Sequence, residues 1–168
     1  MTALGTEAMV RMGELQVSRD AGDVLVTIGL GSCIGLALID RTRPLAGLAH
    51  IVLPKSGHDG EAPAAKFADL AVPALLGQLT GLGAIAARLD AVLVGGAQMF
   101  SFGSSPTLDI GRRNEEATRA ALAEAGIAVR AAATGGSKGR TIRVHVDSGR
   151  VLVNEPGSAE VEVYGGAR

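Results

Sequence analysis

Short apolar segments rich in Val, Ile, Leu and Ala recur along this chain, and most of them end at a glycine or a turn-forming cluster. Such segments predict β-strands. We expect strands over 10–17, 24–28, 33–39, 46–53, 89–94, 127–133, 141–146 and 150–154. Helical spacing occurs over 66–79 and 114–125. Because strands outnumber helices and several are joined by hairpins, we predict an α+β fold with mixed β-sheets flanked by helices; a doubly wound α/β fold is the alternative.

The two helical segments differ in how well their ends and interiors suit a helix. In 114–125, the residues Ala117, Ala121 and Leu122 share one face, and Gly126 suits the C-terminal cap. In 66–79, Pro73 removes a backbone donor and is expected to kink or split the helix.

Length and charge limit the classes of protein to which the chain belongs. Its 168 residues predict a single domain, with a core over about 10–153 and flexible ends. The net charge of −1 argues against nucleic acid as a partner, and no apolar run is long enough to insert into a membrane. With one cysteine and no signal-peptide pattern, a cytoplasmic location is expected.

That one cysteine, Cys33, follows a glycine-rich turn and precedes His50 by seventeen positions. A lone thiol cannot form an internal disulfide, so Cys33 is either an inert core residue or a nucleophile. An imidazole close to the sulfur can take its proton and hold the resulting ion pair. Free cysteine and histidine are also common as ordinary buried residues, and the residues alone leave both readings open.

The register of the predicted hairpin between 33–39 and 46–53 decides whether the two groups meet. If paired positions sum to 85, Gly35 lies opposite His50 and Cys33 lies opposite Val52. Cys33 and His50 are then diagonal neighbours on one face, and Gly35 leaves room for the imidazole. A slip of one residue places them on opposite faces. Catalysis therefore requires the odd-sum register or a bend at Cys33.

The residues around Cys33 suit the approach of a substrate carbonyl. Gly31 lets a substrate come close to the backbone, and the amides of Ser32 and Cys33 are candidate oxyanion donors.

Two further groups of residues are candidates for a site. The histidines and the cysteine match no zinc template, so no metal site is predicted. Met99, Phe100 and Phe102 place two of the four aromatic residues in one expected loop. They are either buried loop packing or a partner-docking patch.

Five motifs together resemble a known family, the chemoreceptor glutamine deamidases of bacterial chemotaxis called CheD. The resemblance extends from about Val10 to Val153. Its motifs are Leu30-Gly31-Ser32-Cys33, Ala49-His50-Ile51-Val52-Leu53-Pro54, Gly95-Gly96-Ala97-Gln98-Met99-Phe100, Ile110-Gly111-Arg112-Arg113-Asn114 and Thr134-Gly135-Gly136.

The resemblance implies an α+β fold and a cysteine amidohydrolase that needs no cofactor. It implies that Cys33 is the nucleophile, that His50 is the general base and acid, and that Thr27 orients the imidazole. It implies deamidation, through a thioester, of glutamines on the cytoplasmic helices of methyl-accepting receptors. A receptor methylesterase activity and a CheC-type phosphatase partner are also implied for some members.

A second hypothesis belongs to a different class. Here the chain is a non-catalytic binding module that regulates a CheC-type phosphatase, and the aromatic residues between Met99 and Phe102 motivate it.

Overall fold

The computed structural model describes residues 6–57, 62–98 and 109–165. The described strands are β1 (Glu7–Met9), β2 (Leu15–Ser18), β3 (Val24–Leu30), β4 (Ile34–Asp40), β5 (Ala46–Ile51), β6 (Leu89–Gly95), β7 (Ala128–Thr134), β8 (Arg140–His145), β9 (Val151–Asn154) and β10 (Val161–Tyr164). The helices are α1 (Ala68–Gly81) and α2 (Ile110–Ala125), with short 3-10 turns at Ala64–Lys66 and Ala86–Arg88.

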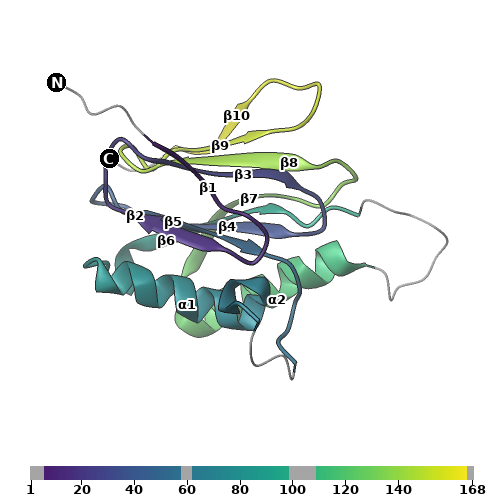
Figure 1. The fold of residues 1–168 in the computed structure, drawn as a ribbon, viewed down its shortest axis with the longest axis horizontal. Helices are drawn as coiled ribbons and strands as arrows, with labels where there is room; N and C mark the ends of the chain where they lie inside the picture. Colours follow the sequence, from purple (N-terminus) through teal and green to yellow (C-terminus); the bar gives the residue numbers. More distant parts are fainter. Residues whose placement is uncertain (1–5, 58–61, 99–108, 166–168) are drawn as a thin grey trace.

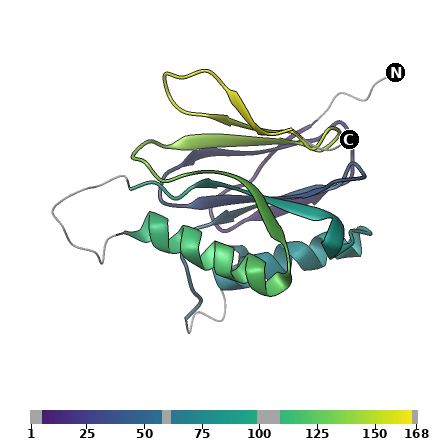
Figure 2. The same ribbon diagram turned by 180° about the vertical axis from the view of Figure 1, so that it is seen from behind.

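The elements form three layers. An outer sheet, of order β1-β3-β8-β9-β10, lies over a central sheet of order β2-β5-β4-β6-β7. Both α-helices cover the face of the central sheet that points away from the outer sheet (Figures 1 and 2). The pairs β1–β3 and β6–β7 are parallel and the other pairs are antiparallel. The predicted α+β fold with mixed sheets is therefore confirmed.

Strand β4 explains why the central sheet is the hydrophobic middle of the molecule. Ala37 and Ile39 point into the core between the two sheets, whereas Leu36 and Leu38 point into the core under the helices. All seven of its residues are buried. Burying each large aliphatic side chain contributes about 1.5–3 kcal/mol. A continuous apolar strand is thus stable only where both of its faces are covered, as they are here.

The predicted strand over 10–17 is wrong in its extent. Only β2, in the central sheet, overlaps this range; β1 ends at Met9 in the outer sheet, and a turn at Met12 and Gly13 separates the two strands. Gly13 adopts a φ of 78°, which favours glycine and allows the chain to change sheets. Strand β10 lies beyond the predicted core of 10–153 and was not anticipated.

The helices agree with the prediction except in two details. Helix α1 continues through Pro73 and is not split, since Pro73 lies in its N-terminal half and residues on both sides of it pack against the central sheet. Helix α2 begins four residues earlier than predicted, because the Asp109 side chain accepts a hydrogen bond from the Arg112 amide at 3.2 Å and caps it. The C-terminal cap at Gly126, with φ 75°, is confirmed.

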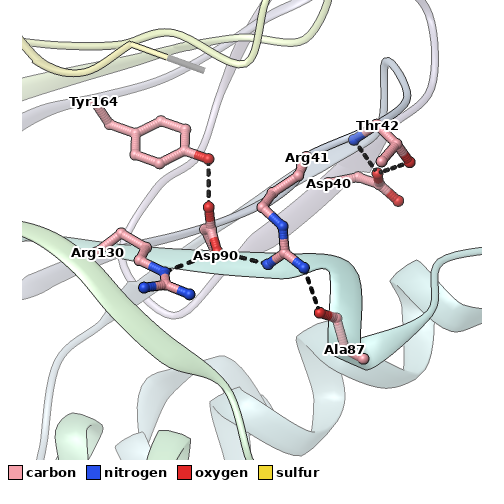
Figure 3. A network of polar contacts seen from close by, with 7 residues as sticks. All are labelled: Asp40, Arg41, Thr42, Ala87, Asp90, Arg130 and Tyr164. Atoms are coloured by element: carbon pink, nitrogen blue, oxygen red, sulfur yellow. Dashed lines mark hydrogen bonds and ion pairs between the residues drawn. The ribbon is translucent and has the colours of Figure 1, made fainter. Parts of the chain in front are cut away.

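A network of charged side chains joins the two sheets at one end of β6. Asp90 is 4% exposed. It accepts hydrogen bonds from Arg41 at 2.9 Å, Arg130 at 3.3 Å and the Tyr164 hydroxyl at 2.7 Å (Figure 3). Tyr164 belongs to β10, so this contact ties the last strand of the outer sheet to the central sheet.

Candidate active site

Cys33 lies at the end of the β3–β4 connection, one residue before β4 begins. It is half-buried and packs against the core between the sheets. In the neighbouring hairpin, Ile34 pairs with Ile51 and Gly35 pairs with His50. Paired positions therefore sum to 85, and the register that catalysis requires is the one observed.

The alternation of side chains places Cys33 and His50 on the same side of the central sheet. Ala46 and Leu48 of β5 point toward the outer sheet, and His50 continues that alternation. Cys33 precedes Gly35 by two positions and packs against the same core. The two groups are thus diagonal neighbours across the hairpin end.

The expected role of Gly35 needs correction. A Cβ atom built at Gly35 meets the Leu30 side chain at 2.8 Å and the Ile142 side chain at 3.3 Å. Glycine is required here because the outer sheet approaches closely, and the space beside Gly35 is occupied by Leu30.

The His50 ring is held by a backbone carbonyl. The side chain is 5% exposed, and its Nδ1 lies 3.3 Å from the carbonyl oxygen of Val10. A carbonyl oxygen only accepts, so Nδ1 carries the proton in this contact and Nε2 keeps a lone pair. No other hydrogen bond to the ring is recorded among the described residues, which leaves Nε2 available as a base.

Thr27 contacts the same carbonyl and not the imidazole. It is fully buried on β3, and its hydroxyl donates to the Val10 oxygen at 2.8 Å. Within the described ranges no direct hydrogen bond joins Thr27 to His50. Val10 is therefore the intermediary between them, a role that its aliphatic side chain gives no reason to expect from the sequence.

Burial keeps both reactive groups neutral. It raises the pKa of the Cys33 thiol. It also lowers the pKa of His50, an effect partly offset by the Val10 hydrogen bond and the negative charge of Glu14. Among the described residues no hydrogen bond is recorded between the sulfur and the imidazole. The resting site thus resembles a neutral thiol beside a neutral base, not the ion pair considered from the sequence.

The residues just before Cys33 are held from the β6 side by their carbonyl groups. The Ala97 amide donates to the Gly31 oxygen at 2.8 Å, and the Gly96 amide donates to the Cys33 oxygen at 2.9 Å. A Cβ atom at Gly95 would lie 2.2 Å from the Cys33 oxygen. Only glycine permits this approach, and it allows the β6 end to support the Cys33 turn.

Asn114 is a site residue that lies in one of the family-like motifs, although the sequence indicates no role for it. Its side-chain amide donates to the Ser32 carbonyl and to the Val52 carbonyl, both at 2.9 Å. It is the only α2 side chain that, within the described residues, is hydrogen-bonded to the backbone on both sides of the hairpin end. The apolar periodicity of a helix gives no signal for such a contact.

Met99, Phe100 and Phe102 lie outside the described residues. Among those described, no group of three or more His, Cys, Asp or Glu side chains is arranged to hold a metal ion.

The sequence of the chain is similar to those of known proteins. Residues 52–155 match the family model described as CheD chemotactic sensory transduction. The chain is also 46% identical over 157 residues to a protein of Symbiobacterium thermophilum named "Probable chemoreceptor glutamine deamidase CheD", covering 92% of this chain and 95% of that protein. The chain belongs to the CheD family.

Other members of the CheD family are nearly as similar. A protein of Archaeoglobus fulgidus with the same name is 43% identical, over 89% of this chain and 94% of its own length. The "Chemoreceptor glutamine deamidase CheD" of Thermotoga maritima is 38% identical, over 90% and 94%. The family model begins after Cys33 and His50, but the similarity to these relatives extends over the segment that contains both. Separately, none of the described helices combines the length and apolar character needed to cross a membrane.

Proposed function

We propose that this protein deamidates glutamine side chains to glutamate on the cytoplasmic helices of methyl-accepting chemotaxis receptors, with Cys33 as nucleophile and His50 as general base and acid. The observation that carries the proposal is the pairing of Gly35 with His50, which puts the imidazole and the thiol on one face of the hairpin end. The names of the relatives supply the substrate class.

The fixed tautomer of His50 suits the first step. With Nδ1–H held by the Val10 carbonyl, Nε2 accepts the proton of the Cys33 thiol as the sulfur attacks the carboxamide carbon. A carbon–sulfur bond forms, and the carbonyl oxygen becomes an oxyanion. The amides of Ser32 and Cys33, next to Gly31, are the proposed donors to that oxyanion.

The intermediate then collapses in the direction that releases ammonia. The carbon–nitrogen bond breaks as His50 Nε2–H protonates the leaving amide nitrogen, and a thioester on Cys33 remains. A water molecule next gives its proton to Nε2 and attacks the thioester carbon. The carbon–sulfur bond breaks, the sulfur regains the proton, and the receptor side chain leaves as glutamate.

Thr27 acts in this scheme as a positioning residue. Its hydroxyl donates to the Val10 oxygen, which in turn accepts from His50 Nδ1. Restraining this carbonyl restrains the ring, so Thr27 orients the imidazole through one intermediate group.

Two extensions follow from the same proposal. A receptor glutamate methyl ester presents an acyl carbon to Cys33 in the same way, so a methylesterase activity uses the same thioester. A CheC-type phosphatase is the proposed regulatory partner, with Met99, Phe100 and Phe102 as its candidate contacts.

The test uses a glutamine-containing cytoplasmic receptor fragment. We expect the wild-type protein to release ammonia and to convert specific glutamines to glutamate, measured by mass spectrometry. His50→Ala should lower the rate by about 10²–10⁴. His145→Gln, a change to a half-buried histidine of the outer sheet, is the matched control and should retain the activity. Equal rates for wild type and His50→Ala would contradict the assignment of His50.

A further inference from the structure

Asn114 is a fully buried residue in the first turns of α2. Its Nδ2 group donates both of its hydrogens, to the carbonyl oxygens of Ser32 and Val52. Because both partners only accept, the orientation of the amide is fixed. Its Oδ1 atom is buried and has no hydrogen-bond partner within residues 6–57, 62–98 and 109–165.

The two carbonyls that it holds belong to the two chain segments that carry the reactive pair. Ser32 directly precedes Cys33, and Val52 lies two residues after His50. One amide group on α2 thus fixes both strand ends of the hairpin where the reaction is proposed to occur.

The contact to Ser32 also sets the direction of a donor. None of the described peptide bonds is cis, and in a trans peptide the N–H points opposite to the C=O. Holding the Ser32 oxygen toward α2 therefore turns the Cys33 N–H away from α2. The Ala97 amide, by holding the Gly31 oxygen, does the same for the Ser32 N–H.

The N–H groups of Ser32 and Cys33 are available to donate to a substrate oxygen. In the described part of the chain, neither the Ser32 amide nor the Cys33 amide donates a hydrogen bond to any group. By this geometry the Ser32 N–H points away from Ala97, and the Cys33 N–H points away from α2. Two adjacent backbone donors beside a nucleophile form the arrangement that stabilises an oxyanion.

We infer that Asn114 is a positioning residue that builds the oxyanion-binding site, by orienting the Ser32–Cys33 peptide and by locking that peptide to the His50 strand through Val52. The inference rests on the proposed deamidation. Leaving the buried Oδ1 without a partner costs free energy, so the two hydrogen bonds donated by Nδ2 are what this amide contributes to the site.

The experiment compares two reactions of one sulfur. Deamidation passes through an oxyanion, whereas alkylation of Cys33 by iodoacetamide needs the thiolate but forms no oxyanion. For Asn114→Ala we expect kcat for deamidation of the receptor fragment to fall about 10–100-fold with KM within twofold. The rate of alkylation should stay within twofold of wild type, and the pH midpoint of alkylation should not shift. Asn154→Ala, which removes an exposed amide bonded to the Ser158 carbonyl, is the matched control and should change neither reaction.

The outcomes separate the inference from the function on which it rests. An active wild type with unchanged deamidation in Asn114→Ala overturns the inference alone, and so does a parallel fall of deamidation and alkylation. A wild type that does not deamidate overturns both. If thermal unfolding shows that Asn114→Ala does not fold, the same comparison is made on Asn114→Ser, which fits the space and lacks the double donor.

Discussion

The two ends of the β4–β6 strand pair differ in what their charged groups contact. At the end where Ile34 pairs with Gly95, backbone amides and glycines hold the Cys33 turn, and Arg140, paired with Glu155, contacts β6 only through the Gly95 carbonyl. At the end where Ile39 pairs with Asp90, the buried Asp90 carboxylate accepts hydrogen bonds from two arginines and a tyrosine (Figure 3).

The difference has a chemical consequence. A fixed charge bonded directly to Cys33 or His50 would shift its pKa strongly and commit it to a single protonation state. The described hydrogen bond to the His50 ring comes from a neutral backbone carbonyl, and the Glu14 charge only partly offsets the effect of burial on the pKa of His50, so the imidazole stays able to take and return a proton. The charged network can be strong because no proton has to move there. Changes at the Gly95 end should therefore affect activity, whereas changes at the Asp90 end should affect only stability.

The largest effect is expected for Gly95→Ala. The new Cβ atom meets the Cys33 carbonyl at 2.2 Å, and Gly95 has a φ of 111° that alanine disfavours. We expect the free energy of unfolding to fall by about 3 kcal/mol and deamidation to fall at least 100-fold. Gly77→Ala is the control: it lies in α1 with no atom within 4 Å of the new Cβ, and should stabilise by about 0.5–1 kcal/mol. Urea unfolding and fragment deamidation measure both effects.

Asp90→Ala should destabilise the Asp90 end of the β4–β6 strand pair. It removes the acceptor of Arg41, Arg130 and Tyr164, and both arginines are exposed enough to regain water. We expect the free energy of unfolding to fall by about 2 kcal/mol. The kcat of the folded protein should stay within twofold, because the site is at the opposite end of β6. A tenfold loss of kcat in fully folded protein would show that the ends are not independent.

Thr27→Val tests the role of the Val10 carbonyl, which accepts from the Thr27 hydroxyl and contacts His50 Nδ1. The side chain keeps its shape and loses the hydrogen bond to the Val10 oxygen. We expect kcat to fall about tenfold because the imidazole is less well oriented. Thr27→Ser restores the hydroxyl and should recover most of the rate. Equal rates for the two variants would rule out a role for the hydroxyl.

The smallest effect is expected from Glu14→Gln, and it should appear in the pH dependence of kcat/KM. Burial lowers the pKa of His50, so the imidazole is neutral and active at pH 7, and activity should fall on the acid side as it becomes protonated. The same shift makes stability fall as pH drops below the ordinary histidine value, since the unfolded chain binds that proton first. The Glu14 charge raises the pKa of His50, so Glu14→Gln should move the acid limb of kcat/KM to lower pH. A move to higher pH would contradict this electrostatic assignment.

The parts of the fold that depend on local pattern were predictable. Two apolar runs joined by turn residues predicted the β4–β5 hairpin, whereas its register was only a condition for catalysis, and the structure meets that condition. Helix α2 and its cap at Gly126 followed from apolar spacing and a glycine at the right place.

The contacts that complete the site were not predictable in this way. Asn114 is 82 residues from Ser32 in sequence and 62 from Val52, and a single asparagine in an amphipathic helix normally indicates a solvent-exposed position. Val10 acts through its carbonyl, which every residue has. Strand β10 is short and largely exposed, and its link to Asp90 spans 74 residues. Long-range polar contacts leave little trace in local sequence pattern.

The most direct test of the catalytic assignment is the reaction of the Cys33→Ala protein with the receptor fragment. Cys33 is the only cysteine of the chain, so no other thiol can replace it. With folding verified by thermal unfolding, mass spectrometry should find no glutamine converted to glutamate above the rate without protein. Conversion by Cys33→Ala at the wild-type rate would contradict Cys33 as the nucleophile.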